Sequence, residues 1–87
     1  MNKTKVIFRK WKDNGQIIAL FPENTDRRKL TVSSYEHLGQ YADADYNGVI
    51  SLTTLAREEE YKDLLAELKS IGYENLRILK KRHVQFY

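Results

Sequence analysis

Oxygen-bearing side chains recur at alternate positions of the segment 43–54, in a pattern that is able to bind calcium. The matching positions of a twelve-residue EF-hand loop are Asp43, Asp45 and Asn47, with the required glycine at Gly48. The last position is Thr54, where an EF-hand needs a bidentate carboxylate. We therefore interpret Asn47-Gly48 as a turn, predict no metal and no cofactor, and keep a degenerate EF-hand-like calcium loop as the second alternative function.

A second group of reactive side chain types lies just before this segment. Tyr35 and His37 share one face of an extended strand, Asp45 is able to orient the imidazole, and Ser33 is a nominal nucleophile. No spacing here demands catalysis, so we predict that the protein is not an enzyme. We instead expect these side chain types to contact a partner protein. The predicted partner-binding residues are Arg9, Trp11, Tyr35, His37, Gln40, Asp45 and Tyr46.

Trp11 lies among basic residues, a composition typical of surfaces that stack bases and follow phosphates. The structural interpretation is that Trp11 covers Ile18 across a hairpin. No helix-turn-helix, zinc-finger or RNP-type signature is present, so weak nucleic-acid binding is the alternative to protein binding. Its predicted residues are Arg9, Lys10, Trp11, Lys12, Arg27, Arg28, Lys29, Lys80 and Arg82.

Composition predicts one small domain. The 87 residues are 41% hydrophobic and contain no cysteine, so one core without disulfides must stabilise the domain 1–87, and we expect residues 83–87 to fray.

Lys and Arg outnumber acids eight to three in residues 1–35 and four to none in 76–87, whereas acids outnumber bases nine to three in 36–75. No signal peptide or apolar run of bilayer length is present, so we expect a cytoplasmic monomer or weak homodimer with no membrane contact.

The segment from Glu58 to Gly72 is predicted to be an amphipathic helix. Its apolar residues recur at helical spacing, and Gly72 suits a left-handed C-terminal position. The predicted apolar stripe is Tyr61, Leu64, Leu65, Leu68 and Ile71. Such a one-sided helix requires a sheet or another helix to cover.

Asn14-Gly15 between two β-rich runs predicts a hairpin of residues 5–12 and 16–21. A two-residue loop would pair Phe8 with Phe21, Lys10 with Ala19 and Lys12 with Ile17. One face then carries Val6, Phe8, Ile17, Ala19 and Phe21, and the other carries Ile7, Trp11, Ile18 and Leu20 with Arg9. Because both faces are apolar, we expect either that both are covered or that one is covered and the other is offered to a partner.

Further strands are predicted over 30–38, with Val32 and Tyr35 on opposite faces, and over 76–80 at a sheet edge. The second half of 30–38 fits a turn of helix equally well. Residues 39–54 give a mixed signal. The predicted fold is α+β, with a three- or four-stranded, mostly antiparallel sheet and one main helix packed on it, in the order β-β-β-α-β.

Several short runs together resemble a group of small uncharacterised bacterial proteins often encoded near mobile or prophage-like genes. The runs are KVIFRK (5–10), ALFP (19–22), SYEHLGQ (34–40), ADY (44–46), EEY (59–61) and IGY (71–73). The resemblance implies a bacterial cytoplasmic origin and a small α+β domain, and it implies no activity. Because no residue pattern in the chain carries a clear catalytic signature, the predicted function is a non-catalytic binding or accessory module that acts through protein–protein contacts.

Overall fold

The computed structural model describes residues 4–26, 31–36 and 40–79. Its elements are β1 (Thr4–Trp11), β2 (Ile17–Asp26), β3 (Thr31–Glu36), β4 (Gln40–Asp45), α1 (Tyr46–Leu52), β5 (Thr53–Leu55), α2 (Glu58–Ser70) and β6 (Leu76–Ile78). The α+β prediction is confirmed. The predicted strand count of three or four is wrong, because six strands form one sheet within these residues, and a second helix accompanies the expected one.

Strand β1 is the centre of the sheet. The strand order is β4-β3-β2-β1-β5, with antiparallel pairing throughout, and β6 adds to β1 in parallel. β5 pairs with Arg9–Trp11 and β6 pairs with Thr4–Val6. Both lie on the β1 edge away from β2, since the carbonyls of Val6 and Phe8 accept hydrogen bonds from Leu79 and Ala56. Two short strands therefore share one edge.

The β1–β2 hairpin differs from the prediction by two residues in register. Lys10 lies opposite Ile17, not Ala19, because the loop spans four residues from Lys12 to Gly15 and is closed by a 2.8 Å hydrogen bond from the Trp11 amide to the Gln16 carbonyl. Gly15 takes the positive φ of 72° that such a loop needs. A shift of two residues preserves the alternation of side chains, so the predicted faces are confirmed.

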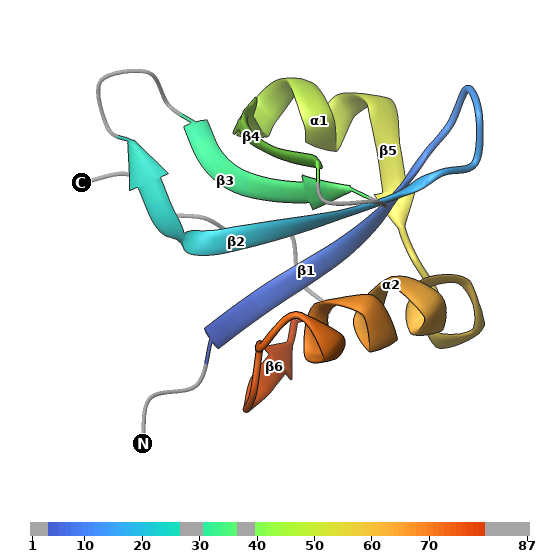
Figure 1. The fold of residues 1–87 in the computed structure, drawn as a ribbon. Coiled ribbons are helices and arrows are strands. Elements are labelled where there is room, and N and C mark those ends of the chain that lie inside the picture. The colour runs from blue at the N-terminus through green and yellow to red at the C-terminus, as the bar shows by residue number, and fades with distance from the viewer. Residues whose placement is uncertain (1–3, 27–30, 37–39, 80–87) are drawn as a thin grey trace.

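The two helices cover opposite faces of the sheet (Figure 1), and a hydrophobic cluster lies under each of them. We call the one under α2 the first core cluster: Val6, Phe8, Ala19, Phe21, Tyr35, Ala56, Tyr61, Leu64 and Leu68. The one under α1 is the second core cluster: Ile7, Ile18, Leu20, Val32, Tyr46 and Val49. Of the two alternatives for the hairpin, cover on both faces is the one observed, and the opposite faces of Val32 and Tyr35 are confirmed.

Helix α2 agrees closely with its sequence pattern. Tyr61, Leu64 and Leu68 are buried and Leu65 is half-buried. Gly72 has a φ of 115°, and its amide donates to the Lys69 carbonyl at 3.2 Å, which ends the helix. Ile71 is the exception, because it lies just past the helix and is 49% exposed.

The segment 40–55 is more regular than predicted. Its backbone forms β4, α1 and β5, so Asn47-Gly48 is part of a helix and the predicted turn is wrong. Tyr46 and Val49, one helical turn apart, are the buried residues of α1 and fill the second core cluster. Tertiary packing therefore stabilises a helix whose own sequence signal is weak.

Candidate functional site

A pocket of about 280 Å³ opens where β5 and β6 approach one another along β1. β6 covers β1 as far as Val6, and β5 begins to pair at Arg9, so Phe8 lies between the two short strands. The lining residues are Phe8, Leu55, Ala56, Arg57, Glu58, Tyr61, Ile78 and Leu79. The pocket is therefore a consequence of the interrupted sheet edge.

The floor of the pocket is apolar and firmly packed. Phe8 is buried and stacks on Tyr61, with ring centroids 4.5 Å apart and an angle of 11° between the rings. Ile78 packs against the first core cluster and Leu79 against the second. Leu55 at the rim is 39% exposed, which gives the pocket an accessible apolar side.

The polar side of the pocket comes from the first turn of α2. Glu58 and Arg57 line the pocket, and both side chains are exposed. Burial, and then the negative charge of Glu58, raise the pKa of the Tyr61 hydroxyl above its ordinary value, so this hydroxyl stays neutral at physiological pH. Arg57 lies 3.6 Å from Glu59, in an ion pair whose side chains are 79% and 73% exposed.

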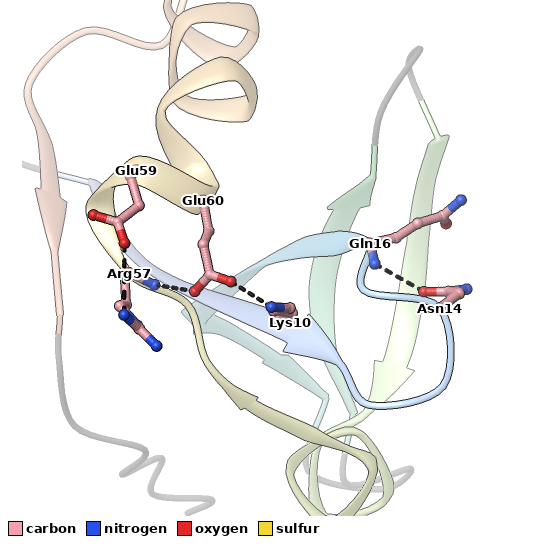
Figure 2. Close-up of polar contacts among 6 residues, drawn as sticks. All are labelled: Lys10, Asn14, Gln16, Arg57, Glu59 and Glu60. Atoms are coloured by element: carbon pink, nitrogen blue, oxygen red, sulfur yellow. Dashed lines mark hydrogen bonds and ion pairs between the residues drawn. The ribbon is translucent and has the colours of Figure 1, made fainter.

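Glu60 fixes the start of α2 against β1 (Figure 2). One carboxylate oxygen accepts a 2.9 Å hydrogen bond from the Arg57 amide, and the other accepts a 2.5 Å bond from the Lys10 ammonium. The Glu60 amide in turn donates to the Arg57 carbonyl at 2.8 Å. These bonds satisfy amide groups that a helix start otherwise leaves free, so the wall of the pocket is held in place.

The predicted partner-binding residues do not gather at this pocket. Arg9, Tyr35 and Tyr46 are buried, Trp11 is half-buried against the second core cluster, and Asp45 is exposed at the end of β4. His37 and the side chain of Gln40 lie outside the described residues. Tyr35 donates a hydrogen bond to Glu67, which joins β3 to α2.

The predicted nucleic-acid residues within the described ranges contact the protein itself. Arg9 donates from Nε and Nη2 to the side chain and carbonyl of Thr53, both at 2.9 Å, and Lys10 pairs with Glu60. Lys12 donates to the Ser51 carbonyl at 3.2 Å. The other predicted residues, Arg27, Arg28, Lys29, Lys80 and Arg82, lie outside those ranges.

The calcium-like segment is not a continuous loop. Asp43 and Asp45 lie in β4, whereas Asn47 and Gly48 lie in α1. An EF-hand instead wraps these positions around the ion. Within residues 4–26, 31–36 and 40–79, no group of three His, Asp or Glu side chains is arranged to hold a metal ion.

Sequence reasoning missed the pocket, although part of its signal was visible in the acidic run from Glu58 to Glu60.

None of the helices in the described ranges combines the length and the apolar character required to cross a membrane. Comparison of the chain with protein families, curated proteins and solved structures found no match. The pocket and its charges are therefore the basis for a functional proposal.

Proposed function

We propose that this chain is a non-catalytic binding module that contacts a partner protein through the pocket between β5 and β6. The observation that carries the proposal is the apolar opening in the sheet edge, with Leu55 exposed beside it. Apolar surface rimmed by polar residues is typical of protein interaction sites. Anchor side chains of a partner commonly fill pockets of this kind.

The size and polarity of the pocket favour a partner side chain over a small-molecule substrate. Sites for drug-sized ligands usually enclose ~300–1,000 Å³, and this pocket, at about 280 Å³, is as small as the smallest of them. Catalysis needs a nucleophile or base within hydrogen-bond reach of a positioned partner group. The polar lining groups are instead an Arg57 already paired with Glu59, a neutral Tyr61 hydroxyl and the Glu58 carboxylate.

Protein binding has more support than nucleic-acid binding in the described ranges. A phosphate-binding surface needs cations that face solvent. Arg9 is only 5% exposed, and Lys10, whose side chain is 41% exposed, is paired with Glu60. Lys12 is exposed and donates to the Ser51 carbonyl. All three cations therefore have contacts within the fold.

Site-specific photocrosslinking tests the proposal. A photoreactive phenylalanine analogue at Leu55 is expected to capture one partner in host cells, whereas the same analogue at Ala66, an exposed position on α2 outside the pocket lining, is not. The captured protein is then purified and its affinity measured. Leu55→Ser should weaken binding at least about fivefold, because an anchor contact commonly contributes more than ~1 kcal/mol. Equal capture at both positions, or unchanged affinity of Leu55→Ser, contradicts the proposal.

A further inference from the structure

We infer that the partner group that enters this pocket is a lysine or arginine side chain, with its methylene stem on the apolar floor and its cation beside Glu58. The inference rests on the proposed function and adds the chemistry of the occupant. It follows from three features of the pocket: one carboxylate that has no partner among the described residues, an apolar floor, and an arginine that is paired with Glu59.

The three glutamates of the first turn of α2 differ in what they contact. Glu60 is bonded to Lys10 and to the Arg57 amide, and Glu59 is paired with the Arg57 guanidinium. Glu58 lines the pocket, and it has no hydrogen bond or ion pair with any of the described residues. Its negative charge nevertheless acts on the pocket lining, because it contributes, after burial, to raising the pKa of the Tyr61 hydroxyl.

The floor and the charge together select one class of side chain. A purely apolar occupant would contact the floor but would gain nothing from the negative charge of Glu58. An acidic occupant would be repelled by the carboxylate. Lysine and arginine join an apolar stem to a terminal cation, so they alone match both the Phe8 and Ile78 floor and Glu58.

Arg57 does not already fill this role. Its guanidinium lies 3.6 Å from Glu59, and its side chain is 79% exposed, so it extends into solvent. The Tyr61 ring, stacked on Phe8, adds an aromatic surface to the pocket lining. This stacked pair extends the apolar lining against which the methylene stem of such an occupant packs.

The first part of the test compares two small probes on the full chain by NMR titration. Nα-acetyl-arginine N-methylamide carries the stem and the cation, whereas Nα-acetyl-norleucine N-methylamide carries an apolar stem alone. We expect the arginine probe to shift the amide signals of Ala56, Tyr61 and Ile78, which line the pocket. We expect it to bind at least about threefold more tightly than the norleucine probe, and more weakly as salt is added.

The second part uses two variants that each remove one carboxylate charge from α2. Glu58→Gln should lower the affinity of the arginine probe about two- to fivefold, in line with a partly exposed ion pair. Asp63→Asn removes a carboxylate charge from an exposed position of the same helix that does not line the pocket. It should leave the affinity within a factor of about 1.5. Because both variants change the net charge of α2 equally, a change confined to Glu58→Gln is not an effect of net charge.

Three results contradict the inference, and they separate it from the proposed function. If the norleucine probe binds as tightly as the arginine probe, or if Glu58→Gln leaves arginine binding unchanged, the pocket binds side chains but does not select a cation. The proposed function then survives and the inference fails. If neither probe shifts the pocket signals up to its solubility limit, both fail.

Discussion

The ammonium group of Lys10 and a carboxylate oxygen of Glu60 lie 2.5 Å apart, which joins β1 to the first turn of α2 (Figure 2). This bond, followed by the one from the Arg57 amide, lowers the pKa of Glu60 below its ordinary value of 4.5. The pair lies at the start of α2, the helix that covers the first core cluster. We therefore expect the charge of Glu60 to contribute to the stability of the fold.

The Lys10–Glu60 pair predicts a specific loss of stability in acid. The Glu60 pKa is lower in the folded chain, so the unfolded chain takes up the proton first as the pH falls. The stabilisation is thus complete above about pH 4.5 and is lost as the pH falls through the folded-state pKa. Urea unfolding at pH 6 and pH 3 should show a smaller acid-induced loss for Lys10→Met than for the native chain.

Lys62→Met is the control for the acid effect. Lys62 is exposed on α2 and is not a partner of Glu60, so this variant should keep the native difference between pH 6 and pH 3. An identical acid-induced loss in Lys10→Met and in the native chain would show that the pair does not set the Glu60 pKa.

Arg9, which lies in β1, is expected to stabilise α1 through hydrogen bonds to the end of that helix. Its guanidinium is buried and donates to the carbonyls of Ile50, at 3.3 Å, and Thr53, at 2.9 Å, at the C-terminal end of the helix. Without it, these carbonyls lose a charged donor in a buried place. Arg9→Met should therefore lower the free energy of unfolding by about 1.5–3 kcal/mol, measured by urea denaturation.

Lys12→Met is the matched control, because Lys12 also donates to a carbonyl of α1, that of Ser51, but in an exposed place. Its cost should stay within about 0.5 kcal/mol. If the two variants lose equal stability, burial of the Arg9 contacts is not what makes them strong.

The core under α2 predicts a large effect at Leu68, which has no exposed surface. Leu68→Ala leaves a cavity in the first core cluster and should cost about 2–5 kcal/mol, a large part of the stability of so small a domain. Half-buried Leu65 lies beside the same cluster, so Leu65→Ala should cost clearly less by the same denaturation measurement. A smaller loss at Leu68 than at Leu65 would contradict the placement of the stripe.

The sequence predicted those features whose signals are local. Alternation in β1 and β2 assigned Phe8 and Ile7 to opposite faces even though the loop length was wrong, because a shift of two residues keeps each side chain on its face. The 3.6-residue period of α2 and the position of Gly72 were equally local signals.

The missed features depend on contacts between distant parts of the chain. Helix α1 forms around Asn47 and Gly48 because Tyr46 and Val49 pack beneath the sheet and Arg9 binds the helix end. The pocket requires β5 and β6 to meet β1 at neighbouring places on one edge. No residue pattern within β5 or β6 predicts that both strands pair with the same edge of β1.

Trp11 separates the two functional alternatives, because it is half-buried and packs against the second core cluster. Trp11→Ala should lower the free energy of unfolding by about 1–3 kcal/mol through lost apolar contacts. If single-stranded nucleic acid is instead its partner, the substitution should weaken binding by roughly 1–3 kcal/mol. The affinity should then also fall steeply as salt is added. The slope of log K against the logarithm of the salt concentration should steepen by about 0.7 for each neutralised phosphate.

We expect the stability effect, with only weak and salt-sensitive binding of single-stranded DNA. Fluorescence anisotropy at physiological salt and urea unfolding of the same samples distinguish the outcomes, and Lys12→Met serves as a control for removal of one exposed charge near Trp11. Sub-micromolar affinity for single-stranded DNA that is lost in Trp11→Ala, while the unfolding midpoint stays unchanged, would show that Trp11 binds nucleic acid. It would also favour the basic residues of β1 over the pocket as the functional surface.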